Sequence, residues 1–233
     1  MFRLTLSIFF ITIVSCAQTP KQDHHDTKDK VVSMNDKFMG DDLNVKLWQE
    51  RFENRDRDVY KNREKIVASL DLKSGDHIAD VGAGTGFYLK LLHHKVAPTG
   101  KIYAVELAPK FIEFIKARSV AENLPNVIAS KGGLDTTNLP SSSVDMVFVC
   151  DTYHHFDQPA QMLKDFFRIL KPGGELVIVD FNLVPGKSRE WILKHIKKTK
   201  EDYISEITNG FFKFSHESKI NLDENFMLHF KRN

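Results

Sequence analysis

Three glycines at alternate positions directly follow a short apolar segment that carries one carboxylate. The segment is Ile78–Val81, and the glycines are Gly82, Gly84 and Gly86. Glycine lets the backbone turn sharply and approach a ligand without a Cβ in the way. A strand, a glycine-rich turn and the start of a helix together form a nucleotide site in an open α/β sheet. The sequence therefore predicts that a nucleotide or nucleoside binds at this turn.

The spacing of the glycines and the acidic residue beside them distinguish between classes of nucleotide. A dinucleotide site has the pattern G-x-G-x-x-G and a phosphate loop ends in G-K-[ST]. Here the pattern is D-x-G-x-G-x-G, with no lysine after it. Asp80 would repel a pyrophosphate, which binds bare backbone N–H groups at a helix N-terminus. A carboxylate there suits a cationic ligand such as S-adenosylmethionine, and Glu106, about 20 residues past the turn, suits ribose hydroxyls.

The chain resembles the class I S-adenosylmethionine-dependent methyltransferases, with a domain similar to types 11 and 25. The run Asp80-Val-Gly-Ala-Gly-Thr-Gly86 is similar to their first motif, and Lys171-Pro-Gly-Gly174 is similar to their turn into the fifth strand. The resemblance covers about residue 43 to the end. It implies an α/β, Rossmann-like fold with a seven-stranded, mostly parallel sheet, helices on both faces and an antiparallel C-terminal strand pair.

The resemblance also implies which residues bind S-adenosylmethionine. These candidates are Asp80, Gly82, Ala83, Gly84, Gly86, Glu106, Leu107, Asp135 and Asp151. The family often has Gly-Asp after its third strand, whereas this chain has Gly132-Gly133 with Asp135 two residues on. A backbone contact to the adenine is therefore an alternative to Asp135. Arg63 is a candidate for the cofactor carboxylate, with a surface position on a helix as the alternative.

Polar residues follow the predicted fourth strand, at the sheet edge where ligands bind in open α/β folds. A methyl group on a sulfonium is already activated, so the protein mainly aligns donor and acceptor and excludes water. An oxygen or nitrogen acceptor must also lose a proton, and the candidate catalytic residues are Tyr153, His154 and His155. Histidine titrates near neutral pH and is the commonest general base. We expect one histidine of the pair to face the cleft and the other to face away.

Other kinds of catalytic site find less support in the sequence. A metal site formed by His154, His155, His195 and an aspartate is conceivable, but these residues lack a fixed ligand spacing such as H-E-x-x-H, so no metal site is predicted. His195 lies one helical turn past Trp191 and could approach the same cleft, but a position on the helix surface is expected for it. No G-x-S-x-G sequence is present, which argues against a serine hydrolase of that type.

The pattern of apolar residues places the elements that must position these side chains. Strands are expected at 78–81, 101–106, 127–129, 146–150 and 176–180, with an antiparallel pair at 211–214 and 226–230. Helices are expected over 43–70 with a break near 56–57, from about 85 to 95, from 109 onward, from 159 to 170, and from 188 to about 207. In the helix from 109, Phe111, Ile112, Ile115 and Val120 form the predicted buried face.

The composition fits one globular domain behind an N-terminal extension. The chain has 233 residues, 42% of them hydrophobic, and a net charge of +2 that does not indicate a nucleic-acid surface. We predict a signal peptide at 1–15, a flexible polar linker at 16–42 and the methyltransferase domain at 43–233. Ile13-Val-Ser-Cys16 resembles the bacterial lipoprotein cleavage box, with an ordinary signal as the alternative. Acylation of Cys16 would anchor the protein in the cell envelope, whereas a start at Met34 would leave it in the cytoplasm.

Together these features predict methyl transfer from S-adenosylmethionine to a small-molecule acceptor. We expect a monomer with no nucleic-acid partner and with membrane contact only through a lipid anchor at Cys16. An envelope protein would lie where S-adenosylmethionine is not expected to be supplied. An exported binding or accessory protein that retains the fold is therefore an alternative, and an NAD-dependent oxidoreductase is another.

Overall fold

The computed structural model describes Met1 and residues 33–233, and residues 33–233 form one folded body. Apart from Met1, the signal peptide predicted at 1–15, the lipid anchor at Cys16 and the linker up to residue 32 lie outside the described residues. The body begins before the predicted boundary at residue 43, because a 3-10 turn, η1 (Asp36–Phe38), packs onto it. The rings of Phe38 and Trp48 meet edge to face at 4.8 Å. Among the described helices, none has the length and hydropathy that spanning a bilayer requires.

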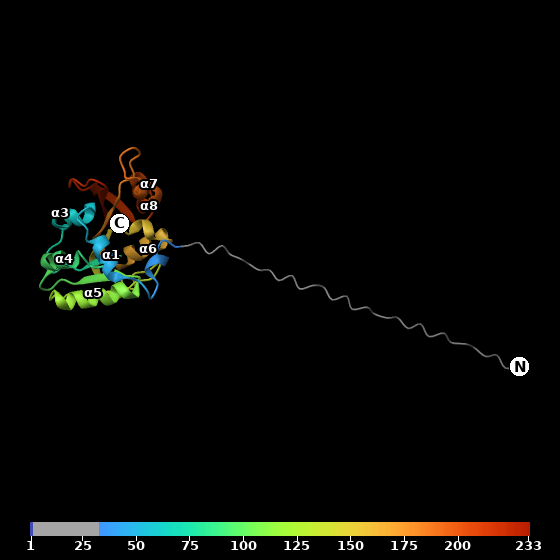
Figure 1. The fold of residues 1–233 in the computed structure, drawn as a ribbon, viewed down its shortest axis with the longest axis horizontal. Helices are drawn as coiled ribbons and strands as arrows, with labels where there is room; N and C mark the ends of the chain where they lie inside the picture. Colours follow the sequence, from blue (N-terminus) through green and yellow to red (C-terminus); the bar gives the residue numbers. More distant parts are fainter. Residues whose placement is uncertain (2–32) are drawn as a thin grey trace. The chain divides into compact units, whose positions relative to one another are not determined.

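A seven-stranded sheet with the order β3-β2-β1-β4-β5-β7-β6 runs through the body (Figure 1). The first five strands pair in parallel, β7 pairs antiparallel with β5, and β6 pairs antiparallel with β7. This confirms the predicted Rossmann-like α/β fold and its antiparallel C-terminal pair. The strands are β1 (Ile78–Val81), β2 (Ile102–Glu106), β3 (Val127–Lys131), β4 (Val144–Cys150), β5 (Leu170–Phe181), β6 (Phe212–Glu217) and β7 (Asn225–Arg232).

Helices cover both faces of the sheet, and each face has its own hydrophobic core. The helices are α1 (Val45–Phe52), α2 (Asp58–Lys61), α3 (Arg63–Ser69), α4 (Leu89–Val96), α5 (Pro109–Ala121), α6 (Pro159–Ile169), α7 (Glu190–His195) and α8 (Lys200–Thr208). Apolar residues of α3, α4 and α5 pack on one face of the sheet. Those of α6 and α8 pack on the other face. Because both faces are covered, β1 and β4 are almost continuously apolar.

The direction of the chain through the sheet reverses between β1 and β4. The connection after β1 leads to β2 on one side, whereas β4 pairs with β1 on the other side. Ligands of open α/β sheets bind at such a switch point, beyond the carboxyl ends of the strands. Gly82, Glu106 and Asp151 each lie at the end of one of these strands, so the fold brings them to the same edge.

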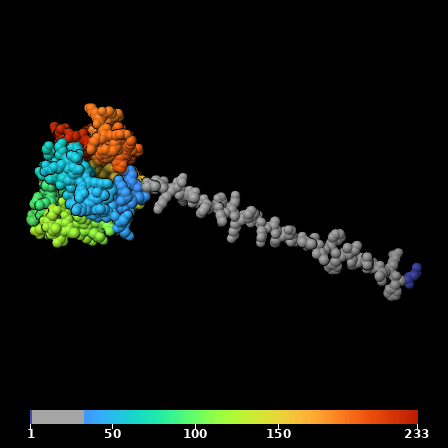
Figure 2. All heavy atoms as spheres, viewed as in Figure 1, coloured from blue at the N-terminus to red at the C-terminus, as the bar shows by residue number. Residues whose placement is uncertain are grey.

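The N-terminal part of the body lies across this edge. A small apolar cluster joins Leu43 to Ala108 and Phe111 of the β2–α5 region, with Phe38, Trp48 and Phe52 packed against it. Figure 2 shows this segment, in blue, against the yellow-green surface of α5. The predicted break between the first helices is confirmed, since α1 ends at Phe52 and α2 begins at Asp58.

Some predicted element boundaries are wrong, for local reasons. The helix expected from residue 85 begins at Leu89, because Gly84 and Gly86 both have positive φ angles, 55° and 73°. Val120 is 84% exposed, since five residues after the buried Ile115 a side chain points about 140° away around the helix. β5 begins at Leu170 and includes the predicted Lys-Pro-Gly-Gly turn, where its register against β4 shifts.

The single helix expected from residue 188 to 207 is in fact two helices. The helix does not begin at Ser188, because the Ser188 hydroxyl donates to the Asn182 carbonyl and accepts from the Val184 N–H. α7 therefore starts at Glu190 without a side-chain cap. A capping box formed by Thr199 and Asp202 starts α8. Such a box satisfies two backbone donors at a helix start, so it favours a new helix there.

Candidate active site

The glycine turn after β1 is held against the ends of both neighbouring strands. The Gly82 N–H donates to the Val105 carbonyl at 2.8 Å, and Gly82 has φ of 74°. A Cβ on Gly82 would lie 2.2 Å from Cγ2 of Thr152, which follows β4. Only glycine therefore allows this approach between the two strand ends.

Glu106 at the end of β2 closes one side of the turn. Its Oε2 accepts from the Gly84 N–H at 2.8 Å, and its Oε1 accepts from the N–H groups of Leu107 and Ala108 at 2.7 and 2.9 Å. Burial raises the pKa of this carboxyl, and the three backbone donors oppose that rise. The side chain is placed where an acidic residue binds ribose hydroxyls in nucleotide sites of this kind.

Asp80 is buried beneath the glycine turn and lacks a partner for one oxygen. Its exposed fraction is 3%, and its Oδ2 forms no hydrogen bond with any described residue. Burial, and secondly the charge of Glu106, raise its pKa to about 7. A buried carboxylate without a partner is costly, and a nearby cationic ligand would relieve it. The orphaned oxygen is therefore consistent with the predicted cationic nucleoside.

A cavity of about 620 Å³ extends from the glycine turn across the carboxyl ends of β1, β2 and β4. Five of the predicted cofactor residues line it: Gly82, Gly84, Glu106, Leu107 and Asp151. The other four do not line it. Asp80 lies beneath the turn, Ala83 belongs to the core, Gly86 packs against Leu89 and Ile115, and Asp135 is exposed on the loop after β3.

Two expected cofactor contacts are made with other protein groups. Arg63 donates to the Tyr60 carbonyl at 2.8 Å and does not line the cavity. Asp151 lines the cavity but forms an ion pair with Arg57 at 2.7 Å and accepts from Asn225 Nδ2 at 2.6 Å. Burial raises the Asp151 pKa to about 6, and the charge of Arg57 opposes the shift. Arg57 therefore lines the cavity, together with Arg51 and Arg189, whereas Arg63 does not.

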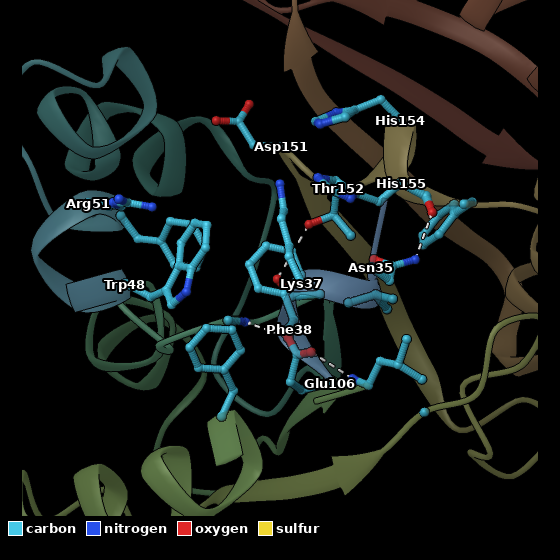
Figure 3. A pocket seen from close by; sticks show the side chains of 18 of the residues that line it. Asn35, Lys37, Phe38, Trp48, Arg51, Glu106, Asp151, Thr152, His154 and His155 are labelled. Carbon is cyan, nitrogen blue, oxygen red and sulfur yellow. Dashed lines mark hydrogen bonds between the residues drawn. The ribbon is translucent and has the colours of Figure 1, made fainter. Parts of the chain in front are cut away.

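Both histidines after β4 line the cavity, which corrects the expectation that they face opposite ways. They belong to a short 3-10 helix, η2 (Tyr153–His155), in which neighbouring residues do not alternate as they do in a strand. His154 Nδ1 lies 2.8 Å from Asp180 Oδ1, and Asp180 is fully buried at the end of β5. Figure 3 shows His154 and His155 next to each other at the cavity wall.

Tyr153 is not part of the cavity. It is 2% exposed, and its hydroxyl donates to Glu206 Oε1 at 2.7 Å on the side of α8. Burial, followed by this carboxylate, raises the Tyr153 pKa. A catalytic role for Tyr153 therefore does not fit the structure, because its hydroxyl is turned into the core.

The comparisons with known proteins agree with this geometry. Residues 79–178 match the family model described as a methyltransferase domain. These residues are therefore similar to a methyltransferase domain. The fold of the body matches a solved S-adenosylmethionine-dependent methyltransferase from Aquifex aeolicus, with a TM-score of 0.72 and 21% identity over 82% of this chain and all of that one. S-adenosylmethionine is the cofactor of this class of domain, as the glycine turn predicted.

Two curated relatives extend the sequence match. The chain is 25% identical to phosphoethanolamine N-methyltransferase 1 of Triticum aestivum, over 61% of its own length and 28% of that protein. It is 29% identical to demethylmenaquinone methyltransferase of Lactobacillus johnsonii, over 51% of its own length and 49% of that protein. The matched segment thus spans half or less of each relative.

Beyond the glycine turn, the cavity has a wall of aromatic side chains that the sequence did not assign to a site. The aromatic residues lining the cavity are Phe38, Trp48, Phe52, Phe111, Phe156, Phe181 and Trp191. Three of them, Phe38, Trp48 and Phe52, come from the N-terminal segment, and Figure 3 shows Phe38 and Trp48 next to each other. Nothing local in the sequence distinguishes the wall of a cavity from the wall of a core.

His195 also belongs to the site, although a position on the helix surface was expected. It is the last residue of α7, and its ring centroid lies 5.1 Å from that of His154 and 5.7 Å from that of His155. Burial, followed by the charges of His154 and Lys37, lowers the His195 pKa. Burial and the charge of His154 lower the His155 pKa to about 3. Of these two rings, His155 is therefore neutral throughout the physiological pH range.

Proposed function

We propose that this protein transfers a methyl group from S-adenosylmethionine to a small, largely apolar acceptor molecule. The observation that carries the proposal is the cavity, which joins the glycine turn and Glu106 at one end to His154 and His155 at the other. A donor and an acceptor held in one enclosed space react as if in a single molecule. The aromatic wall between these ends would exclude water from them.

The residues present fit the cofactor. Gly82 and Gly84 would allow its close approach, Glu106 would hold the ribose hydroxyls, and Leu107 would pack on the adenine. The unpartnered oxygen of Asp80 favours the positively charged end of the molecule. When bound, S-adenosylmethionine supplies a methyl group that is already activated on its sulfonium.

His154 is the candidate for accepting a proton from the acceptor. Its Nδ1 and its backbone N–H both bind Asp180, at 2.8 and 3.2 Å, so the carboxylate fixes the ring orientation. Nδ1 then carries the hydrogen, and Nε2 remains free to accept a proton. His155 is a poorer base, because burial and the charge of His154 hold its pKa to about 3.

The aromatic wall favours an acceptor with a ring or another flat apolar part. Phe181 and Trp191 meet edge to face at 5.1 Å beside the histidines, and both line the cavity. Aromatic side chains bind such groups by burial and by edge-to-face contacts. One relative is named for a menaquinone precursor and the other for phosphoethanolamine. We place the acceptor of this chain nearer to the first kind of molecule.

Binding and transfer can be measured separately. Calorimetry on the full chain in detergent should give heat with S-adenosylmethionine and S-adenosylhomocysteine but none with NAD. Labelled donor incubated with a small-molecule extract should then give a labelled product that partitions into organic solvent. His154→Asn should lower the rate of transfer and leave donor binding unchanged. Donor binding without any transfer would support an accessory protein instead, and binding of NAD alone would support an oxidoreductase.

The place of this protein in the cell envelope is also a proposal, supported only by the sequence around Cys16. A labelled fatty acid supplied to expressing cells should enter the wild-type chain and not the Cys16→Ala variant. Equal labelling of both chains would contradict the lipid anchor. Labelling at Cys16 decides where the protein lies, whereas the transfer assay on the full chain tests the reaction itself.

A further inference from the structure

Three histidines from two separate elements meet at the acceptor end of the cavity. His154 and His155 lie on η2, and His195 ends α7. One ring nitrogen of each lies within 4.8 Å of the corresponding atoms of the other two. Imidazole is the side chain that zinc, copper, iron and nickel favour. We propose that this histidine cluster binds one divalent transition-metal ion, with Zn²⁺ as its representative.

The surroundings of His154 match those of a metal ligand. Metal-bound histidines almost always bond through their other ring nitrogen to a carboxylate or carbonyl. His154 Nδ1 is bonded to Asp180 Oδ1 at 2.8 Å, and Asp180 is itself fully buried. This bond leaves Nε2 as the ligand atom and places a negative charge behind the ring. A carboxylate so close to the site would offset part of the charge of the ion.

A second observation comes from His155. Its Nδ1 is buried and has no hydrogen-bond partner among the described residues. The ring centroid lies only 4.4 Å from that of His154, so the two rings share one side of the cavity. Buried polar atoms in native proteins nearly always have a partner. After a small rotation of the His155 ring, an ion bound at the cluster would be the missing partner of Nδ1.

The cluster has the composition of an open metal site. Catalytic zinc sites use three protein ligands and leave the fourth position of a tetrahedron free. Metal–nitrogen bonds of about 2.0 Å place such ligands roughly 3.3 Å apart, so the three rings need to close slightly around the ion. The fourth position would face the cavity and could take the reacting atom of the acceptor. Only this last step depends on the proposed methyl transfer.

Lys37 offers a way to test the site by a gain of affinity. It lines the same cavity, and its charge acts on both His155 and His195. No carboxylate among the described residues forms an ion pair with Lys37. A fixed positive charge repels a metal cation. Lys37→Met should therefore tighten metal binding, which a merely structural histidine cluster would not show.

The experiment uses the full chain in detergent, stripped of metal, with His24 and His25 replaced by alanine. These two histidines lie outside the described residues and could bind metal by themselves. Zn²⁺ titrated against a competing chelator should bind at one ion per chain. His195→Ala should weaken this binding more than about 100-fold, and Asp180→Asn about 10- to 100-fold. His94→Ala, an exposed histidine on α4, should have no effect.

Control measurements on the same samples test whether each variant is folded and whether it binds the donor. Urea unfolding without metal shows whether each variant is folded, and His195→Gln replaces any His195→Ala sample that is not. Co²⁺ in place of Zn²⁺ should give the visible absorption of a tetrahedral site in the parent chain and not in the His195 variant. Equal Zn²⁺ affinity of the parent and the folded His195 variant would overturn the proposal, as would no binding by the parent. Donor binding, measured by calorimetry on the metal-free chain, tests the methyltransferase proposal independently.

If the metal binds, Nε2 of His154 is a ligand and is no longer the proton acceptor. The acceptor would then lose its proton to solvent on coordination, and its reacting atom would attack the methyl carbon as the bond from carbon to the sulfonium breaks. The electron pair of that bond stays on the sulfur, so no oxidant or reductant is needed. Transfer that depends on Zn²⁺ or Co²⁺ would support this order of events, whereas full activity in the presence of a strong chelator would contradict it.

Discussion

Gly82 is restricted both by its backbone angles and by its neighbour. Its φ of 74° disfavours any residue with a Cβ, and a Cβ there would also meet Thr152 at 2.2 Å. Gly186 has nearly the same φ, 76°, but no atom lies within 4 Å of its would-be Cβ. Comparing substitutions at Gly82 and Gly186 therefore distinguishes the cost of backbone strain from the cost of steric overlap.

We expect Gly186→Ala to lower the free energy of unfolding by about 1 kcal/mol and Gly82→Ala by about 2 to 4 kcal/mol. Gly82→Ala should also weaken binding of S-adenosylhomocysteine at least tenfold, because Thr152 and the turn must move apart. Urea unfolding and calorimetry measure the two effects. Equal losses of stability in the two variants would show that the contact with Thr152 is easily relieved.

Asp80 makes the stability of the ligand-free protein depend on pH. Its pKa in the folded protein, about 7, lies above the ordinary value of 3.8, because the carboxyl is buried and Glu106 is near. Between these values the folded state holds a proton that the unfolded chain has released, so this group lowers stability as the pH rises from about 4 to about 7. The loss is complete above pH 7.

Asp80→Asn removes this dependence, since an amide does not ionise. The unfolding free energy of Asp80→Asn minus that of the wild type should therefore rise by about 2 to 4 kcal/mol from pH 4.5 to pH 8. Urea unfolding without donor at these two pH values measures the gain. The exposed Asp135→Asn is the control and should show no such change. A constant difference between Asp80→Asn and the wild type would mean that Asp80 ionises normally in the folded state.

At the scale of elements, the start of α8 depends on its own cap. Thr199 and Asp202 bond reciprocally, with Asp202 Oδ2 accepting from the Thr199 N–H at 2.7 Å and Thr199 Oγ1 accepting from the Asp202 N–H at 3.2 Å. Thr199→Ala should lower the free energy of unfolding by about 1 kcal/mol. Thr208→Ala, in the last turn of the same helix, should change it by less than about 0.5 kcal/mol. If urea unfolding gave equal values, the box would not explain the break between α7 and α8.

That break shows where the sequence could predict an element and where it could not. Strands β1 and β2 and the positions of Gly82, Glu106, His154 and His155 could be predicted, because each residue follows a short buried strand and strand ends share one edge. A single helix was expected over 188–207, so His195 was placed on an exposed surface. Its approach to η2 results from the direction of α7 after β5, which no local pattern contains.

The same limit explains the aromatic wall. Phe38 and Trp48 lie in a segment whose polar neighbours suggested a linker or a charged helix. Phe38 contacts Phe111 and His155, and Trp48 packs against the cluster that contains Phe111, so these contacts join parts of the chain that are more than 60 residues apart. Such contacts depend on the packing of α1 over the sheet edge, and a search for periodicity cannot find them. Asp180 was similarly recognised only as the end of a strand.

At the scale of the whole molecule, residues 33–42 belong to the cavity and not to a separate linker. Asn35 Nδ2 donates to the His155 carbonyl at 3.0 Å, and Ser33 Oγ donates to Asp157 Oδ2 at 2.7 Å. Asn35, Lys37 and Phe38 line the cavity together with Glu106 and the histidines (Figure 3). A domain boundary at residue 43 would therefore remove one wall of the site.

Two truncated chains test this boundary. A chain beginning at Ser33 should bind S-adenosylhomocysteine and unfold in urea as the full chain does, because the hydrophobic clusters described for the body contain only residues after 33. A chain beginning at Leu43 should lose about 1 to 2 kcal/mol of stability with the contacts of Phe38, and should bind at least tenfold more weakly because the cavity is open to water. Phe38→Ala in the full chain should reproduce part of this loss, since its ring packs on Trp48 and Phe111. Unchanged affinity in the shorter chain would show that the donor is held by the sheet edge alone and that the N-terminal segment is only a cover.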